Sequence, residues 1–241
     1  MIKGIYTVAA SMSPRMRQQE VIADNIANVQ TAGFKGNSVF MRMVQSAQSG
    51  SDETAANWET QMLDRVYTDF SQGSLEHTGR DLDLALEGDG FFVIETALGE
   101  AYTRNGSFSI SPAGLLVTSN GDPVQTDAGT LAITGNSVRI DPGGQITVDD
   151  QPVAVLRVVD FPQPYELERQ GATVWRAPGD AVAEDVSTPM VRQGYLEKSN
   201  IDVLREMVDM IDSFRAFENS QRLIQIQDES LSKAVNEVGK L

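Results

Sequence analysis

Few side chains in this sequence could take part in catalysis or hold a metal ion. The chain of 241 residues contains a single histidine, His77, and no cysteine. This composition excludes multi-histidine metal sites, disulfides and thiolate chemistry. His77 lies in a stretch rich in Gly and Ser, and we interpret it as a structural residue. The residue types therefore predict no metal site built on histidine or cysteine.

Two pairs of aspartates, Asp81/Asp83 and Asp149-Asp150, are the remaining groups that could bind calcium or act as a paired acid and base. Neither pair lies in the Asp-x-Asp-x-Asp-Gly loop of an EF-hand calcium site. An alternating strand would turn Asp81 and Asp83 toward solvent, and Asp149-Asp150 is typical of a turn between strands. We therefore expect a protein that is not an enzyme, with no catalytic residues, cofactor, metal or small-molecule substrate.

The net charge of −15 and the lack of long apolar runs exclude further classes of partner. Nucleic acid is not expected, because proteins bind phosphate backbones through basic patches. No run of about 18 apolar residues could span a bilayer, so membrane insertion is not expected. The first seven residues lack the apolar segment of a secretory signal, and we expect no cleaved signal peptide.

The strongest pattern in the chain predicts a long helix at its C-terminal end. From Val203 an apolar residue recurs at every seventh position, and no Gly or Pro interrupts residues 201–238. A heptad repeat keeps one face of a helix turned toward a partner helix, as in a coiled coil. An amphipathic helix packed on the core of its own domain is the alternative. The predicted interface consists of Val203, Met210, Phe217, Ile224 and Leu231, together with Met207 and Phe214.

A weaker repeat predicts a second helix over residues 2–30, with Met12, Met16 and Ile26 in its seam. Pro14 interrupts the repeat, so the helix either bends there or restarts with Pro14 in its first turn. Gly33 fits the left-handed position that follows a helix end. Residues 1–44 carry a net charge of +3 and residues 195–241 a net charge of −3, which favours pairing of the two ends.

The sequence between these helices has a different character. Residues 45–61 are polar and aperiodic, and we interpret residues 45–79 as a linker or extended loop. Residues 80–194 alternate short β-prone runs with turn signals such as Asn105-Gly106, which is typical of a sandwich or a barrel. The predicted fold is α+β: a mainly-β domain, sandwich-like or barrel-like, between N- and C-terminal coiled-coil-forming helices, over residues 1–44 and 195–241, that pair with each other.

Three stretches of the chain resemble one family, the rod and hook proteins of the bacterial flagellum. The first is DNIANVQTAGFK at residues 24–35, which is similar to the N-terminal signature of that family. The second is DLDLALEGDGFF at residues 81–92, followed by YTRNGSF at 102–108. The third is GYLEKSNI at residues 194–201, followed by MVDMI and RAFE. The three stretches occur in the family's order over nearly the whole chain.

The resemblance implies a structural subunit of the basal-body rod, the drive shaft that spans the periplasm and transmits torque from motor to hook. The flagellar type III export apparatus would export it without a cleaved signal. Its terminal segments would be disordered before assembly and would then form an inner coiled-coil tube. The partners would be other copies of the chain and the neighbouring proximal and distal rod proteins. Asn25, Asn28, Gly33 and Phe34 would end the first helix and direct the chain outward.

Within the family, the short segment between Lys35 and Asp81 looks most like the proximal rod protein, with the distal rod protein second. An extracellular β domain with a helical oligomerisation stalk, such as an adhesin or a phage-tail piece, is an alternative from another class, and it predicts a stable small oligomer. A carbohydrate-active enzyme is a third reading, and it would require two carboxylates about 5–10 Å apart.

Overall fold

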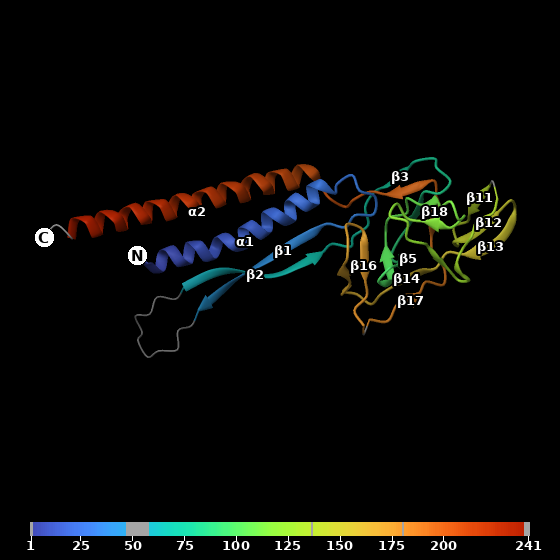
Figure 1. Ribbon diagram of the computed structural model, residues 1–241, viewed down its shortest axis with the longest axis horizontal. Coiled ribbons are helices and arrows are strands. Elements are labelled where there is room, and N and C mark those ends of the chain that lie inside the picture. Colours follow the sequence, from blue (N-terminus) through green and yellow to red (C-terminus); the bar gives the residue numbers. More distant parts are fainter. Residues whose placement is uncertain (1, 47–57, 136, 180, 239–241) are drawn as a thin grey trace. The chain divides into compact units, whose positions relative to one another are not determined.

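The computed structural model describes residues 2–46, 58–135, 137–179 and 181–238, and the chain divides into two units (Figure 1). Unit 1 comprises residues 1–27, 37–69 and 202–241. Unit 2 comprises residues 28–36 and 70–201. The protein is α+β, as expected, with its two helices in unit 1 and a mainly-β central region.

Unit 1 is built from two antiparallel helices and a long β-hairpin. Helix α1 spans Ile2–Ala27 and helix α2 spans Val203–Val238. The two helices lie side by side, and α1 also contacts strands β1 (Asn37–Ser46) and β2 (Trp58–Thr68) (Figure 1). Helix α1 thus packs between α2 and the hairpin. No helix in the described part of the chain is long and apolar enough to cross a membrane.

The boundaries of both helices follow from local chemistry. Asp202 is the N-cap of α2, because its Oδ1 accepts the backbone N–H groups of Leu204 (3.0 Å) and Arg205 (3.3 Å). Helix α1 runs through Pro14 without restarting there. It ends at Ala27, six residues before Gly33, so the prediction that Gly33 follows the helix end directly is wrong. Gly33 does have the expected left-handed conformation, with φ of 67°.

The hairpin corrects the expectation of a loop over residues 45–79. Residues 58–68 form strand β2, which pairs along its length with β1 in an antiparallel register with one bulge at Phe40/Met41. Near the base, Val39 and Val66 are partly buried on one face, whereas Phe40 and Tyr67 are exposed. The strand was missed because its stability comes from a partner about 20 residues away, and a polar composition does not reveal such pairing. The rest of the expected linker, 47–57, lies outside the described residues.

Unit 2 is built from short strands around one larger sheet. The sheet has six strands in the order β15-β16-β6-β5-β14-β17, with the hairpin β5–β6 at its centre. A three-stranded sheet β11-β12-β13 and four strand pairs complete the unit. The strand bounds are β3 (Leu75–His77), β4 (Leu84–Leu86), β5 (Phe91–Thr96), β6 (Gly99–Thr103), β7 (Ser109–Ile110), β8 (Leu116–Val117), β9 (Gln125–Thr126), β10 (Gly129–Thr130), β11 (Val138–Ile140), β12 (Gln145–Val148), β13 (Gln151–Val155), β14 (Val158–Asp160), β15 (Glu168–Arg169), β16 (Val174–Arg176), β17 (Glu184–Asp185), β18 (Val191–Gln193) and β19 (Tyr195–Glu197).

Strand β5 separates two hydrophobic cores, because alternate residues of a strand point to opposite faces. Phe92 and Ile94 belong to a large aliphatic core. Phe91 and Val93 belong to a smaller aromatic core that also contains Trp175. Strand β5 is therefore buried on both faces, and it is the element around which unit 2 is organised.

Two local interpretations of the β region are wrong. Asp81 is exposed as expected, but Asp83 is buried and its Oδ2 accepts the hydroxyl of Thr78 at 2.7 Å, so Asp83 does not face solvent. Asn105-Gly106 does not form a hairpin turn, because the flanking strands β6 and β7 belong to different sheets, and the Gly106 carbonyl accepts the backbone N–H of Leu84 at 3.0 Å. In both cases a contact distant in sequence overrides the local signal. Asp149-Asp150 does form the expected turn, with φ of 49° and 63° between β12 and β13.

Candidate assembly interface

The heptad residues of α2 lie on the side of the helix that packs against α1. Val203, Met210, Phe217, Ile224 and Leu231 are all partly buried. The second column on this side lies three residues after the first, not four as the sequence suggested. It consists of the less apolar residues Glu206, Ser213, Ser220 and Gln227, all of which are partly or fully buried.

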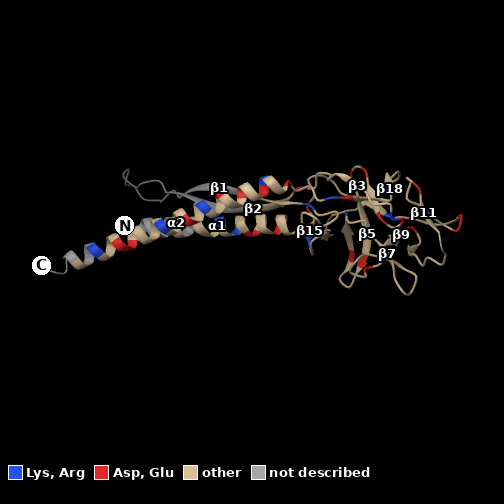
Figure 2. Cartoon of the chain, turned by 90° about the horizontal axis from the view of Figure 1, so that it is seen from above, with Lys and Arg blue, Asp and Glu red and all other residues tan. Residues whose placement is uncertain are grey.

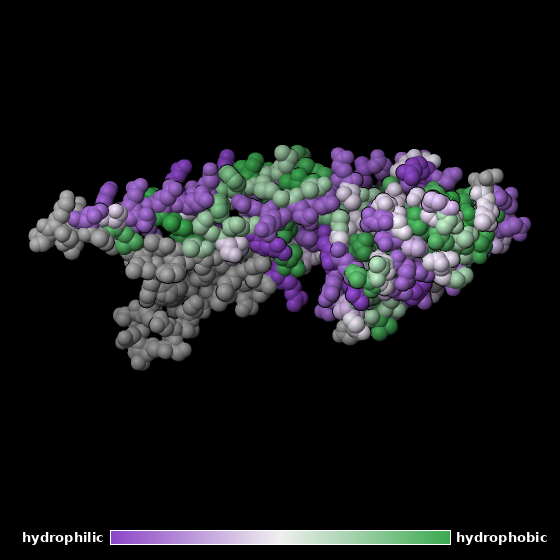
Figure 3. All heavy atoms as spheres, viewed as in Figure 1, coloured by the Kyte–Doolittle hydropathy of each residue, from purple (hydrophilic) through white to green (hydrophobic). Residues whose placement is uncertain are grey.

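The column four residues after the heptad positions faces solvent in unit 1. Met207 is 51% exposed and Phe214 is 56% exposed. We call these two residues and the exposed apolar residues beside them the outer stripe of α2. Figure 3 shows apolar side chains gathered over the first half of this helix. Contiguous exposed apolar surface of this kind marks an interaction site. The outer stripe consists of Leu204, Met207, Val208, Ile211 and Phe214.

The predicted seam residues of α1 divide in the same way. Met12 and Ile26 are partly buried, whereas Met16 is 50% exposed. Four polar atoms of the two helices are buried and have no hydrogen-bond partner among the described residues, and buried polar groups without partners are costly. The contact between α1 and α2 is therefore less favourable than its length suggests. These atoms are Arg15 Nε, Gln19 Nε2, Ser213 Oγ and Gln227 Oε1.

Asn25 joins three elements of unit 1. Its Oδ1 accepts the backbone N–H of Asn37 at 2.9 Å, and its Nδ2 donates to the Asn37 carbonyl at 2.8 Å. The same Nδ2 donates to Glu206 Oε1 at 3.1 Å. Asn25 is only 1% exposed, so it fixes the last turn of α1 to the start of β1 and to α2. Burial raises the pKa of Glu206, while the hydrogen bond from Asn25 opposes that shift.

The remaining predicted residues, Asn28, Gly33 and Phe34, belong to unit 2. The Asn28 carbonyl accepts the backbone N–H of Thr31 at 3.0 Å, which forms the turn after α1. The backbone N–H of Gly33 donates to the carbonyl of Glu197 at 2.7 Å. Phe34 is fully buried, and the Arg169 guanidinium lies over its ring at 4.7 Å from the centroid. Residues 28–35 of the N-terminal motif thus belong to unit 2, whereas Asn25 belongs to unit 1.

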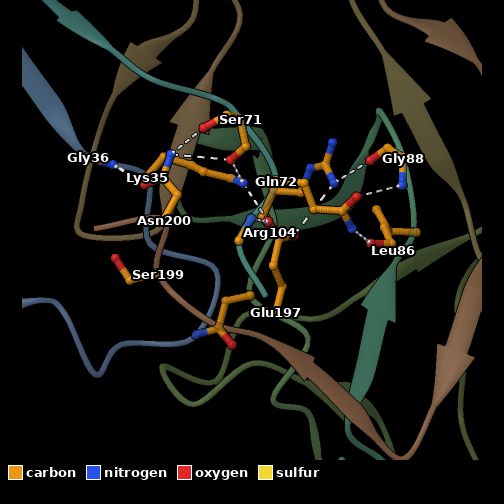
Figure 4. Close-up of polar contacts among 12 residues, drawn as sticks. Lys35, Gly36, Ser71, Gln72, Leu86, Gly88, Arg104, Glu197, Ser199 and Asn200 are labelled. Carbon is orange, nitrogen blue, oxygen red and sulfur yellow. Dashed lines mark hydrogen bonds and ion pairs between the residues drawn. The ribbon is translucent and has the colours of Figure 1, made fainter. Parts of the chain in front are cut away.

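A buried ion pair lies beside these residues, and sequence reasoning assigned it no role (Figure 4). Lys35 Nζ is 2.5 Å from Glu197 Oε1 and donates to the Ser71 carbonyl at 2.7 Å. Arg104 is 3.6 Å from the other carboxylate oxygen. The backbone N–H of Gly73 also donates to Glu197, at 2.9 Å. The sequence carries no local signal for this pair, because 162 residues separate Lys35 from Glu197.

The rest of unit 2 offers little for chemistry. The described residues contain no cluster of three or more His, Asp or Glu side chains that could hold a metal ion. A groove of about 570 Å³ is lined by Asp127, Arg157 and Asp185 among others. Asp127 accepts a backbone N–H and Asp185 is paired with Arg157 at 3.1 Å, so both carboxylates have structural roles. Figure 2 shows Asp and Glu positions, in red, spread over this unit and not gathered at one place.

Comparisons with known proteins agree with the order of these segments. Residues 5–35 match the flagella basal body rod protein family. Residues 85–150 match the flagellar hook protein FlgE/F/G D1 domain, and residues 192–237 match the C-terminal family of the basal body rod FlgEFG proteins. The three matches include both helices, the N-terminal motif and much of unit 2.

Individual relatives align over almost their whole length. The chain is 30% identical to the flagellar basal-body rod protein FlgF of Caulobacter vibrioides, with 100% of both chains covered. It is 32% identical to FlgG of Bacillus subtilis, over 98% of this chain and 99% of the relative. It is 32% identical to FlgF of Salmonella typhimurium, over 96% of each chain. The chain therefore belongs to the flagellar basal-body rod protein family and is a structural rod protein.

Proposed function

We propose that the chain is a rod subunit that assembles through its two terminal helices and transmits torque by packing alone. The observation that carries this proposal is the outer stripe of α2, an apolar surface that unit 1 leaves uncovered. Helices α1 and α2 pair as a coiled coil, and the outer stripe packs against helices of neighbouring subunits. A contact between unlike surfaces that does not close into a ring generates a helical array, which is the form of a rod.

The energy available from the outer stripe is sufficient for such an array. Complete burial of a large apolar side chain contributes about 1.5–3 kcal/mol. Met207 and Phe214 are about half exposed, so each can gain roughly half of that amount on assembly. Several such residues in every subunit resist rotation of one subunit against the next without a covalent bond. Met16 of α1, also half exposed, is the corresponding surface of the other helix.

Partners and location follow from the same proposal. The subunit binds other copies of itself and the adjoining rod proteins, within the part of the basal body that crosses the periplasm. It reaches this place through the flagellar export apparatus without cleavage of a signal peptide. The protein acts on no small-molecule substrate, is not an enzyme and does not bind nucleic acid. Unit 2 carries nine basic and 19 acidic side chains, which disfavours phosphate backbones.

Within the family we propose the FlgF type. The alignments with FlgF relatives extend over 250, 247, 242, 248 and 250 positions, close to the 241 residues of the chain. Those with FlgG relatives extend over 261, 257 and 259 positions, which requires more gaps. The short segment before Asp81 predicts a position in the proximal rod. The order in which rod proteins are added during assembly tests this prediction.

A deletion strain tests the proposal most simply. We expect cells without this chain to be non-motile and to make basal bodies with an incomplete rod, seen by electron microscopy. Motile cells with complete rods would contradict the proposal. Sedimentation velocity of the purified chain at low micromolar concentration distinguishes this proposal from the alternative of a binding module with an oligomerisation stalk. A rod subunit sediments as a monomer there, whereas a stalk gives a closed oligomer.

A further inference from the structure

The buried ion pair of unit 2 connects the two terminal sequence motifs directly. Lys35 ends the N-terminal motif, and Glu197 belongs to the C-terminal motif 162 residues later. Both side chains have 0% exposure. We propose that this pair is a latch: residues 28–36 dock on unit 2 only when the motif around Glu197 is in place, and that motif is held in turn by residues 28–36.

The cost of burying an unpaired charge is the physical basis of the latch. Lys35 Nζ also donates to the Ser71 carbonyl, but a carbonyl is neutral and does not compensate an ammonium charge. A buried ammonium without a carboxylate is strongly unfavourable, so the segment that carries it remains in water instead. Residues 28–36 are therefore docked much less stably before Glu197 is available.

Backbone contacts extend the latch on either side of the ion pair. The backbone N–H of Gly33 donates to the carbonyl of Glu197. The backbone N–H of Gly36 donates to Asn200 Oδ1 at 2.9 Å. With the ion pair, these two bonds join three residues of one segment, Gly33, Lys35 and Gly36, to Glu197 and Asn200 of the other. Ordering one segment thus lowers the entropic cost of ordering the other.

The latch has unequal halves. If Lys35 is removed, Glu197 still has Arg104 at 3.6 Å, itself 3% exposed. If the charge of Glu197 is removed, Lys35 and Arg104 are both left as buried cations beside an uncharged side chain. Loss of Glu197 is therefore more damaging than loss of Lys35. While the motif around Glu197 is not yet folded into unit 2, residues 28–36 remain in solvent. The two segments therefore become ordered in unit 2 together.

Amide hydrogen exchange of the purified full-length chain tests the latch without any rod assembly. In Glu197→Gln we expect the Gly33 amide to exchange about 100-fold faster or more, because one partner of a buried pair is missing. In Lys35→Met we expect a smaller acceleration at Gly33, and also an acceleration at the Lys198 amide, which donates to the Ser74 carbonyl at 2.9 Å. Faster exchange at Lys198 would show that residues 28–36 and the motif around Glu197 are coupled, because Lys35 makes no hydrogen bond to the Lys198 amide.

A neighbouring surface ion pair supplies a matched control. Glu76 and Lys198 are 2.9 Å apart with more than half of each side chain exposed. Exposed pairs contribute little, so Glu76→Gln leaves both amide exchange rates unchanged. If Lys35→Met accelerates Gly33 and leaves Lys198 unchanged, the two segments are independent and the latch is wrong.

A double variant keeps the test decisive if Glu197→Gln also loosens the core amides of β5 and β6. In the double variant Lys35→Met with Glu197→Leu, Arg104 is the only charged side chain left of the three in the buried ion-pair cluster. We therefore expect the exchange rate of the Gly33 amide to be closer to that of the wild type than it is in Glu197→Gln. Exchange at Gly33 as fast as the two single effects combined would mean that the residues act additively. That result would overturn the latch.

Discussion

Replacement of Phe214 by Asp should separate assembly of the rod from folding of the subunit. Phe214 is 56% exposed in the outer stripe, so an aspartate there can remain in water while the chain is monomeric. On assembly the variant loses roughly half of the 1.5–3 kcal/mol that burial of a phenylalanine contributes. It must also bring a carboxylate against apolar surface, which costs about 1–3 kcal/mol more.

The expected loss is therefore about 2–4 kcal/mol for each contact, or roughly 30-fold to 1,000-fold in the association constant. Motility in soft agar and counts of complete rods in purified basal bodies measure the effect, and we expect few complete rods. Circular dichroism of the purified variant should show wild-type helix content. Phe214→Leu is the matched control, because it retains an apolar side chain and should retain motility.

Phe217 provides the contrast, since it is partly buried between α2 and α1. Phe217→Asp, and likewise Ile224→Asp, should abolish rod assembly and also reduce helix content in the purified chain, while unit 2 remains folded. If cells with Phe214→Asp swim at the wild-type rate with normal numbers of rods, the outer stripe does not form the interface. The reasoning from exposed apolar surface would then be refuted.

Three further predictions concern the folded chain. Gly33→Ala should lower the free energy of unfolding of unit 2 by about 2 kcal/mol or more in urea titration, because the φ of Gly33 is positive and a Cβ would overlap the backbone of Asn105. The control is Gly129→Ala, where φ is also positive, at 92°, but the surrounding space is open, so the loss should be clearly smaller. Equal losses for the two variants would contradict this reasoning. Burial, helped by a hydrogen bond to Glu100, raises the pKa of Tyr102 from 10.0 to about 12. Its contribution to stability is therefore complete below pH 10 and is lost between pH 10 and 12, so Tyr102→Phe should weaken the alkaline fall in the urea midpoint. Burial also raises the pKa of Glu206 above its ordinary value of 4.5, so the contribution of Glu206 to the stability of unit 1 is lost as the pH rises above that value. In a titration of helix content against pH, Glu206→Gln should remove this loss. A titration curve like that of the wild type would contradict the prediction.

The parts of the fold that the sequence could predict are those set by local pattern. The heptad repeat from Val203 predicted a helix over 201–238, and α2 spans Val203–Val238, because uninterrupted periodicity is a property of the helix itself. The short β-prone runs and turn signals over residues 80–194 likewise predicted a mainly-β region of short strands, which unit 2 contains. The hairpin of β1 and β2 was not, since each strand is stable only through the other.

The candidate interface shows the same limit. Periodicity predicted that α2 has an apolar face, but it did not show which second column packs against α1 and which faces solvent. Met207 and Phe214 are exposed because Glu206 and Ser213 occupy the inner column. Lys35 and Glu197 were also invisible as a pair, because their contact spans 162 residues. Such contacts depend on the tertiary fold and leave no local signal.

Site-specific photo-crosslinking in the outer stripe tests most directly whether the terminal helices form the contacts between subunits. A photo-reactive amino acid in place of Ile211 is exposed on α2, and one in place of Arg139, exposed on β11, serves as the control. After illumination of purified basal bodies, we expect position 211 to become linked to another copy of this chain or to an adjoining rod protein. The purified monomer should give no such product. If position 211 gives no intermolecular product in assembled rods, the terminal helices do not carry the assembly.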